Sequence, residues 1–330
     1  MSTADFAHEV CWISGQEVRL LLDVDSLIDA VRGAMKTVSR GTTELPLRRG
    51  MPLGNSGNVL GMMPGALLDD SPVFGIKLVS LFPGNSAYGL PSHMGLFVLF
   101  EAQNGKPVAV MDGNAITALR TAAASAVATD ALARADSRVL TILGTGEQSA
   151  AHLQAITRVR NIEEIRIWGR DRSRAEALAQ SDGRAIAVSD LGAAIAGCDI
   201  LCTVTSSATP LVFMPLLATG MHINAVGASH AAAMEIAPDV LASCSVFVDF
   251  EASARDQAGE IIRAVEAGYV SEQVYKNEIG LVLCGDLAGR QSDREITVYK
   301  SLGVAAQDLV AARLAYTRAS AKGIGTTLRL

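Results

Sequence analysis

The sequence predicts an α/β protein with an α+β region toward its N-terminus and a doubly wound parallel sheet after it. A length of 330 residues is enough for about two domains. After residue 138, short and continuous apolar runs alternate with helical stretches, as in parallel strands that are buried on both faces. In the first 115 residues, Gly and Pro divide the apolar runs instead, and we expect an antiparallel sheet there.

Two local signals support the α+β region. Apolar residues recur at helical spacing between Asp25 and Ser39, so the sequence predicts a helix that Asp25 caps and that ends before Gly41. Further along, Asn104-Gly105 joins two apolar runs, which is a strong signal for a β-hairpin.

The parallel sheet is expected after a long Ala-rich helix over residues 116–135. Its strands are predicted at the continuous apolar runs, which are residues 139–144, 165–169, 185–188, 199–205, 222–227 and 245–250. The C-terminal stretch 303–322 is predicted to be a helix. Its small residues allow close packing against either the first domain or another subunit.

Composition and charge exclude several classes of protein. Apolar residues make up 49% of the chain and charged residues 19%, which is too apolar for a disordered chain. The net charge of -6 favours neither nucleic acid nor a membrane surface as a partner, and no apolar stretch approaches the ~18 residues of a membrane helix. The cysteines lack CxxC spacing and no signal peptide is recognised, so we expect a cytoplasmic protein without a metal site.

A strand, a glycine loop and a helix follow one another in VLTILGTGEQSAAHLQAI, residues 139–156. Gly144 permits a tight turn, and Gly146 lets the backbone approach a pyrophosphate at the helix N-terminus. Ser149 stands in place of a third glycine and allows close helix–strand packing. We therefore predict a dinucleotide site that includes Gly144, Thr145, Gly146, Glu147 and Gln148.

The end of the next strand, in IRIWGRDRSR, indicates the type of dinucleotide. An NAD site usually has an acidic residue here for the ribose 2′-hydroxyl, whereas this chain has Gly169 and Arg170, with Asp171 one position late. A guanidinium suits a 2′-phosphate, so NADP(H) is favoured and NAD(H) is the alternative. In the other interpretation, Arg170, Arg172 and Arg174 are solvated charges at the start of a helix that Asp171 caps.

Ligands of open α/β sheets bind beyond the carboxyl ends of the strands. Thr205 follows one predicted strand, and Val226 and Gly227 end another. We expect these residues to contact the nicotinamide half of the cofactor, with Ser229 and His230 as polar groups near the reacting carbon. A helix cap or a loop hydrogen bond is the alternative for Ser229.

Three cationic side chains in apolar surroundings, Arg48, Lys77 and Arg120, are candidates for binding an anion. Burying an unpaired ammonium is costly, so Lys77 within VFGIKLVSLF requires a partner, and a bound carboxylate is one candidate. The alternative for each cation is an internal ion pair or a side chain that reaches solvent. His93 is expected either near the same site or bonded to a loop.

Together, these segments resemble the ornithine cyclodeaminase/mu-crystallin family over roughly residues 45–302. The matching segments run in family order and include LPLRRG, GIKLVSLFPGN, ILGTGEQSAAHLQAI, GMHINAVGAS and REITVYKSLG. The resemblance implies a substrate-binding and dimerisation domain formed by residues 1–115 and 304–330. It also implies a Rossmann domain, residues 116–303, inserted between these two parts, and a homodimer as the usual assembly.

The resemblance also implies roles for particular residues. Arg48, Lys77 and Arg120 match the family's clamp for the α-carboxylate of the substrate, for which arginine is well suited. The loop from Gly144 to Gln148 matches the family's pyrophosphate loop.

Two further positions indicate which branch of the family the chain resembles. Gly169-Arg170 is similar to the NADPH-type pattern of the mu-crystallins. Ser229 stands where the cyclodeaminases carry an aspartate that acts as acid and base, and a serine cannot relay protons in that way near neutral pH. Ser229 instead resembles the ketimine reductases, although the chain departs from these at His230 and in AAAMEI.

The predicted function is the NAD(P)H-dependent reduction of an imino acid, either a cyclic ketimine or an open 2-imino acid, to an L-amino acid. Arg48, Lys77 and Arg120 would hold the substrate carboxylate. The candidates for protonating the substrate, in addition to solvent, are Lys77, Ser229 and His230. Two alternatives are an ornithine or lysine cyclodeaminase that uses catalytic NAD, and a non-enzymatic, crystallin-like NADPH-binding protein.

Overall fold

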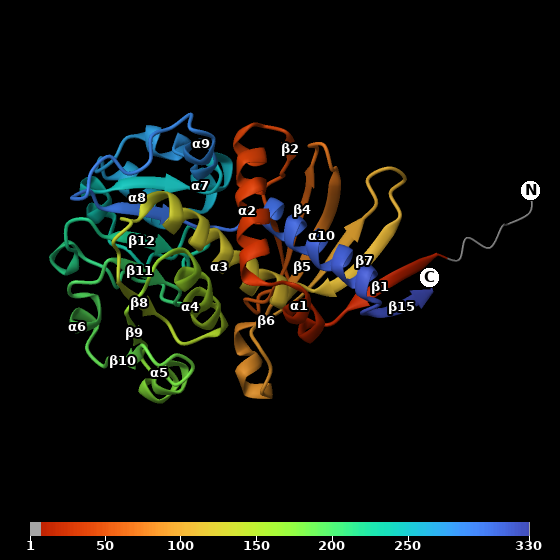
Figure 1. Cartoon of the computed structure of the whole chain (residues 1–330), viewed down its shortest axis with the longest axis horizontal. Coiled ribbons are helices and arrows are strands. Elements are labelled where there is room, and N and C mark those ends of the chain that lie inside the picture. The colour runs from red at the N-terminus through yellow and green to blue at the C-terminus, as the bar shows by residue number, and fades with distance from the viewer. Residues whose placement is uncertain (1–7, 330) are drawn as a thin grey trace, which may run out of the picture. The chain divides into compact units, whose positions relative to one another are not determined.

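The computed structural model of the chain describes residues 8–329 and divides into two compact units (Figure 1). Unit 1 comprises the chain up to Ala30, residues 41–120 and the chain from Ala305 onward. Unit 2 comprises residues 31–40 and 121–304. The units differ from the expected domains at residues 31–40, 116–120 and 304, and the boundaries after Ala30 and Arg120 fall inside two helices, α2 (Val24–Ser39) and α3 (Gly113–Leu132).

Unit 1 is built on an eight-stranded sheet in the order β15-β1-β7-β6-β5-β4-β2, with β3 also paired to β4. All neighbours are antiparallel except β1 and β7, so the expected antiparallel sheet is confirmed. The strands are β1 (Glu9–Ile13), β2 (Thr43–Glu44), β3 (Arg49–Pro52), β4 (Val59–Leu67), β5 (Val73–Leu81), β6 (His93–Phe100), β7 (Pro107–Asp112) and β15 (Thr326–Arg329).

Local sequence signals explain the turns and caps of unit 1. The hairpin between β6 and β7 turns at Asn104-Gly105, as predicted, with Gly105 at φ 74° and the Asn104 carboxamide accepting from the backbone N–H of Lys106. The predicted helix is α2, but Asp23 caps it rather than Asp25, because the Asp23 carboxylate accepts from the N–H of Ser26. A short helix, α1 (Gly15–Leu21), precedes it.

The C-terminal helix α10 (Ala305–Lys322) packs on one face of the sheet of unit 1, against β4, β5 and β6 (Figure 1). Small residues allow this close approach: a Cβ atom at Gly65 of β4 would lie 2.7 Å from the Cβ of Ala305. The small-residue stripe of the C-terminal helix therefore packs within the chain, on the first domain. This contact brings α10 directly above the row of β5 side chains that includes Lys77.

The opposite face of the same sheet is apolar and is half-buried or exposed. One row across β4, β5 and β6 consists of Met62, Leu78 and Leu96, and Leu96 is 42% exposed. The next row is Pro64, Ile76, Val98, Val110 and Trp12. An apolar face of this extent on one side of a sheet is typical of an interaction surface.

Unit 2 is built on a seven-stranded sheet in the order β10-β9-β8-β11-β12-β14-β13, and every pair is parallel. The predicted strands and the doubly wound fold are confirmed. The strands are β8 (Val139–Leu143), β9 (Glu164–Trp168), β10 (Ala185–Ala187), β11 (Ile200–Thr203), β12 (His222–Ala225), β13 (Ser245–Val248) and β14 (Thr297–Lys300). Strand β14 was not predicted, yet it is completely buried between β12 and β13.

Helices cover this sheet and join its strands, as a doubly wound fold requires. They are α3, α4 (Glu147–Val159), α5 (Arg172–Ala179), α6 (Leu191–Ile195), α7 (Glu251–Gln257), α8 (Gly259–Glu266) and α9 (Ile279–Cys284). A buried histidine ties α3 to α4: one ring nitrogen of His152 lies 2.9 Å from the Ser125 hydroxyl and the other lies 2.7 Å from the carbonyl of Gln148. Burial lowers the pKa of His152 to about 4, so its ring is neutral at pH 7.

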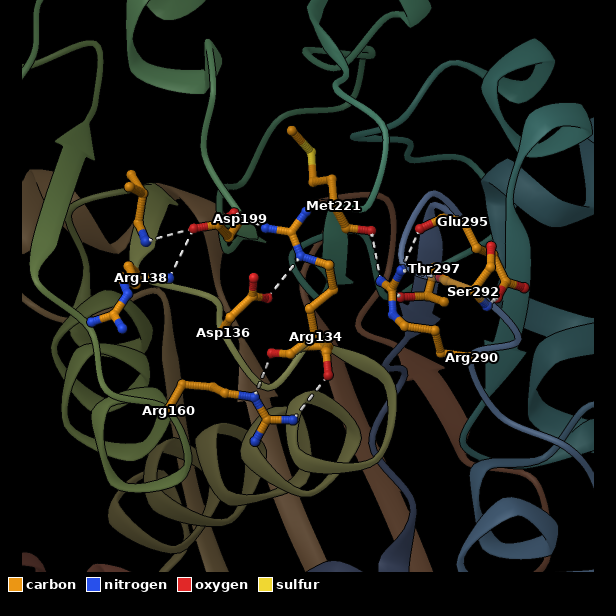
Figure 2. A network of polar contacts seen from close by, with 12 residues as sticks. Arg134, Asp136, Arg138, Arg160, Asp199, Met221, Arg290, Ser292, Glu295 and Thr297 are labelled. Carbon is orange, nitrogen blue, oxygen red and sulfur yellow. Dashed lines mark hydrogen bonds and ion pairs between the residues drawn. The ribbon is translucent and has the colours of Figure 1, made fainter.

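Arginines lie along the edge of the unit 2 sheet at which its parallel strands begin (Figure 2). Arg160 donates to the carbonyl of Arg134 and to backbone carbonyls at the end of α3, including those of Thr129 and Ala133. Arg290 donates to the carbonyls of Leu132 and Met221. Cations suit the carbonyl end of a helix, so this network stabilises the edge that lies opposite the expected cofactor edge.

Two features are absent from residues 8–329. Within that range, no helix is long and apolar enough to cross a membrane. The same residues contain no group of His, Cys, Asp or Glu side chains that could hold a metal ion.

Candidate active site

The glycine loop of unit 2 lies between the end of β8 and the start of α4, as predicted. Gly144 has φ +131°, and a Cβ atom there would lie 2.8 Å from the carbonyl oxygen of Val204. Both the backbone conformation and the close approach to the neighbouring strand therefore require glycine at this position.

The start of α4 fits a pyrophosphate. Gly146 is its N-cap and offers no side-chain cap, and a Cβ atom there would meet nothing within 4 Å. The side-chain oxygens of Gln148 and Ser149 are buried and have no hydrogen-bond partner among the described residues. Uncapped N–H groups, the positive end of the helix dipole and open space together form a site for a phosphate group.

The end of β9 brings Gly169 against this loop. A Cβ atom at Gly169 would lie 2.5 Å from the Cγ2 atom of Thr145. Arg170 follows as an exposed side chain that has no partner within residues 8–329. Asp171 caps α5 by accepting from the N–H of Arg174, which is what the alternative interpretation of this segment expected.

The other two arginines of this segment are engaged in local ion pairs. Arg172 pairs with Glu176 at 2.7 Å, and Arg174 pairs with Asp171 at 3.4 Å. Exposed pairs of this kind contribute little to stability, but they place both guanidinium groups on the helix surface. Of the three arginines, Arg170 is therefore the candidate for a 2′-phosphate.

A buried glutamate holds the carboxyl ends of β11 and β12. The Glu235 carboxylate accepts from the Thr203 hydroxyl at 2.8 Å, from the N–H and hydroxyl of Thr205 at 2.8 and 2.6 Å, and from the N–H of Gly227 at 2.7 Å. Burial raises the pKa of Glu235 above its ordinary value, against the hydrogen bonds from Thr205 and the charge of Lys300. Sequence analysis missed this residue, which lies in the AAAMEI segment.

The remaining predicted cofactor residues lie at the same edge. Val226 is buried and Gly227 follows it, and a Cβ atom at Gly227 would lie 2.1 Å from the carbonyl oxygen of Thr205. Ser301 was not predicted: its N–H donates to the carbonyl of Ala225, and its buried hydroxyl has no partner among the described residues. This hydroxyl could donate a hydrogen bond to a carboxamide group such as that of a nicotinamide.

Ser229 and His230 lie in the loop after β12. Ser229 is half-buried and His230 is exposed. Both residues therefore follow a strand end, where the sequence placed them, and their catalytic roles stay predictions.

Unit 1 contains a buried cluster of charged side chains between β5, α3 and α10. The ammonium of Lys77 lies 3.0 and 2.9 Å from the two carboxylate oxygens of Asp308 and 3.2 Å from the Thr117 hydroxyl. The Nε of Arg120 lies 2.9 Å from Asp308, and its Nη1 lies 2.7 Å from the carboxamide oxygen of Gln307. Lys77 and Arg120 are thus brought together, as predicted, by a carboxylate that was not predicted.

Asp308 supplies the partner that Lys77 was expected to need. The internal ion pair, which was the alternative to a bound carboxylate, is therefore present, and the two cations share this one carboxylate. The signal for Asp308 in the sequence is that it is the acidic residue of α10, among small and apolar side chains. Its contact with Lys77 spans 231 positions of the chain, which local patterns do not reveal.

The other two predicted substrate residues differ in their relation to this cluster. Arg48 is half-buried just before β3, and its charge contributes to lowering the pKa of Lys77. His93 lies on the same face of the sheet as Lys77 but opposite Leu81, roughly 13 Å further along the strands. Its ring contacts the Ser92 hydroxyl at 2.9 Å, and its role in substrate binding stays a prediction.

Comparison with known proteins identifies relatives over nearly the whole chain. The family model described as "Ornithine cyclodeaminase/mu-crystallin family" matches residues 11–323. A Delta(1)-pyrroline-2-carboxylate reductase of Bacillus cereus is 33% identical over 322 residues, which cover 96% of this chain and 98% of the relative. The ketimine reductase mu-crystallin of Mus musculus is 36% identical over 310 residues, which cover 92% and 96% of the two chains.

Two solved structures of reductases and dehydrogenases are also similar to this chain. The Delta(1)-pyrroline-2-carboxylate reductase of Thermococcus litoralis, in complex with NADH and L-proline, has a TM-score of 0.92 and 32% identity, covering 96% of this chain and 99% of that chain. An archaeal alanine dehydrogenase dimer with bound NAD has a TM-score of 0.90 and 32% identity, covering 97% and 99%.

Proposed function

Because the chain belongs to the ornithine cyclodeaminase/mu-crystallin family, we propose that it is an oxidoreductase that reduces an imino acid to an L-amino acid with a nicotinamide dinucleotide. The substrate is a cyclic ketimine, such as a pyrroline-2-carboxylate, or the open imine of a 2-oxo acid. Relatives named as reductases of such imines, and a similar structure that holds NADH and L-proline, support this substrate class.

The buried charged cluster of unit 1 carries this proposal. Lys77 and Arg120 bring two positive charges to a single shared carboxylate, that of Asp308. The charge of Arg48 acts on the same lysine. Buried charge in surplus favours a ligand that brings a compensating anion, and a planar guanidinium suits a carboxylate in particular.

The residues of the chain would act mainly by positioning. A bound nicotinamide dinucleotide supplies the hydride. Lys77 and Arg120 hold the substrate carboxylate and thereby orient the imine carbon, and positioning of this kind provides much of an enzymatic rate. Burial lowers the pKa of Lys77 to about 8, so its ammonium carries a proton at neutral pH that it can donate to the imine nitrogen, directly or through water.

Ser229 distinguishes this activity from that of a cyclodeaminase. Reduction of a protonated iminium requires no strong acid from the protein, whereas deamination requires a group that exchanges protons near neutral pH. A serine hydroxyl can orient the substrate or a water molecule but cannot exchange protons in that way. The residue therefore supports a reductase rather than an ammonia lyase.

The test is NADPH and NADH oxidation by the purified protein, followed at 340 nm, with a panel of imino acids. The panel comprises pyrroline-2-carboxylate, piperideine-2-carboxylate, and pyruvate with ammonium or methylamine. We expect saturable oxidation with at least one carboxylate-bearing imine and none with its decarboxylated analogue. Folded protein that binds NADPH but oxidises it with no member overturns the proposal, as does ammonia release from ornithine without net cofactor turnover.

We further propose that NADP(H) is preferred over NAD(H). The support is the end of β9, where Gly169 replaces the acidic residue of an NAD site and the exposed Arg170 follows next to the glycine loop. An aspartate at the end of β9, as in an NAD site, would repel a 2′-phosphate, and this chain has no acidic side chain at that position.

We also propose a homodimer that forms through the open apolar face of the sheet of unit 1. Its rows of apolar side chains run across β4, β5, β6 and β7, and Leu96 and Met94 are among the exposed large apolar residues. An apolar sheet face that is half-buried or exposed suits a second copy of the same chain in a two-fold arrangement. The dimer of the archaeal alanine dehydrogenase supports this assembly.

We place the protein in the cytosol. Its cysteines are free in the structure, which supports a reducing compartment. Burial raises the pKa values of Cys198 and Cys202 to about 12, so these thiols are unreactive core residues rather than redox groups.

A further inference from the structure

Asp308 is the residue on which the charged cluster of unit 1 converges. Its carboxylate is completely buried, and it accepts from Lys77 through both oxygens and from the Nε of Arg120 through one of them. Lys77 is 2% exposed and Arg120 is 4% exposed, so both cations depend on partners within the protein. A buried carboxylate placed between two candidate substrate-binding cations is a candidate for controlling both.

The packing of α10 makes this contact possible. Gly65 and Ala305 allow the helix to approach β4 closely, which brings the short side chain of Asp308 within reach of the neighbouring strand β5. Lys77 projects from β5 on the face that α10 covers, next to the buried Phe97 of β6. The position of Asp308 is thus determined by the helix backbone rather than by a flexible side chain.

The hydrogen bond that Arg120 donates to the carboxylate also orients its guanidinium. Asp308 engages its Nε, and Gln307, the preceding residue of the same helix, engages its Nη1 at 2.7 Å. Within residues 8–329, Nη2 has no hydrogen-bond partner. Two adjacent residues of α10 therefore engage two of the three guanidinium nitrogens, Nε and Nη1, and leave Nη2 for a ligand carboxylate.

The charge of Lys77 depends on the groups that face it from three elements. These are Asp308 on α10, Arg120 on α3 and Arg48 before β3. Burial lowers the pKa of Lys77 to about 8, the carboxylate of Asp308 raises it, and the two arginines lower it. Burial alone would raise the pKa of Asp308, but the charges of Arg120 and Lys77 overcome this and hold it below its ordinary value.

We infer that Asp308 is a positioning residue for imino acid reduction: it keeps the ammonium of Lys77 protonated, and it holds this ammonium and the guanidinium of Arg120 in the orientation that binds the substrate carboxylate. The inference rests on the proposed function for the identity of the ligand. The effect on Lys77 itself does not depend on turnover, so it can be measured separately.

The first test is the titration of Lys77 in the Asp308→Asn variant. Lysines labelled with ¹³C at Cε are followed by NMR against pH, and Lys77 is identified by the resonance missing from Lys77→Arg. Without the opposite charge, only burial and two like charges act on the amine, so we expect it to titrate at least about one pH unit lower than in the unmodified protein. An unchanged or higher titration midpoint overturns the inference, whether or not an imine is reduced.

The second test uses kinetics with the best imino acid of the panel. We expect Asp308→Asn to raise KM roughly tenfold or more, and to move the alkaline limb of the kcat/KM profile to lower pH, because Lys77 loses its proton earlier. The dissociation constant for NADPH should be unchanged, since the glycine loop belongs to unit 2. A uniform loss of kcat with unaltered KM and pH profile contradicts the inference.

Two control variants separate positioning from folding. Asp23→Asn removes the ion pair between Asp23 and Arg318, which lies 2.6 Å away on the same helix α10, and it should leave the kinetics unchanged. Asp308→Glu keeps the negative charge, so Lys77 should titrate close to its original midpoint while KM rises from the altered geometry. A Glu variant whose Lys77 titrates as in Asp308→Asn overturns the role of the charge.

A double-mutant cycle tests whether Asp308 acts through Lys77. In a Lys77→Gln background, adding Asp308→Asn should raise KM much less than it does in the unmodified protein, because the lysine that Asp308 holds is already absent. Full additivity of the two changes would contradict the inference.

Discussion

The proposed preference for NADP(H) over NAD(H) rests on a single side chain. Arg170 follows the strand end at which an NAD site has a carboxylate, while its neighbours Arg172 and Arg174 form ion pairs along α5. The same segment therefore contains one arginine that is available to a phosphate and two that form ion pairs on the surface of a helix. Counting arginines in the sequence does not separate these roles, whereas their contacts do.

Arg170→Ala is predicted to weaken NADPH selectively. A guanidinium–phosphate contact contributes about 1.5–3 kcal/mol, so KM for NADPH should rise roughly 10- to 100-fold while KM for NADH changes little. Initial rates with both cofactors at saturating imino acid provide the measurement, and Arg172→Ala is the matched control. An equal rise in KM for NADPH and NADH would contradict a contact between Arg170 and the 2′-phosphate.

At the scale of elements, the cofactor edge of unit 2 depends on how the ends of β11 and β12 are held together. Both strands end in short polar turns, and Glu235 satisfies donors from each of them. A second buried pair supports it: Lys300 lies 3.0 Å from Glu260, which in turn accepts from the N–H of Glu235. The turns are thus positioned by a buried polar network rather than by apolar packing.

Glu235→Gln is predicted to loosen this edge. An amide has one acceptor oxygen instead of two, so donors from Thr205 or Gly227 lose their partner, at a cost of about 1–3 kcal/mol in the free energy of unfolding. The dissociation constant for NADPH should rise roughly tenfold, measured by fluorescence titration. Glu163→Gln, at an exposed ion pair with Arg138, is the control. Lower stability with unaltered cofactor binding would restrict Glu235 to a structural role.

For the whole molecule, the two faces of the sheet of unit 1 have different roles. α10 covers one face and contributes Asp308 to the charged cluster, while the other face presents rows of apolar side chains. If the apolar face joins two copies of the chain, the same sheet carries the charged cluster on one face and the dimer interface on the other. The assembly would then hold β5, and with it Lys77, from both sides.

Leu96→Glu is predicted to weaken the dimer. A carboxylate buried without a partner in an apolar interface costs about 3 kcal/mol or more, so the dissociation constant should rise by more than about a hundredfold. Sedimentation or light scattering over a range of protein concentrations measures this. Leu20→Glu, at a 69% exposed position of α1, should remain dimeric. A monomeric unmodified protein, or an unaffected Leu96→Glu dimer, would contradict this interface.

Much of the fold follows from short segments of the sequence. The glycine loop, the Asn104-Gly105 hairpin, the helix α2 and most strands of unit 2 were predictable because neighbours in the chain determine them. Strand β14 was not, since a four-residue run that is buried between two other strands has no local signature beyond its apolar and aromatic side chains. Its place in the sheet, next to the edge strand β13, depends on the strands that pair with it.

By itself, the sequence determined the type of fold, the position of the glycine loop and the identity of two cations that would need a partner when buried. It did so because these features depend on local backbone geometry and on the cost of burying charge. Only the tertiary structure decided what those cations contact. Asp308 and Lys77 are 231 positions apart, and Glu235 joins two strand ends through side-chain hydrogen bonds. Long-range polar contacts of this kind arise from the packing of whole elements, which no local pattern in the chain specifies.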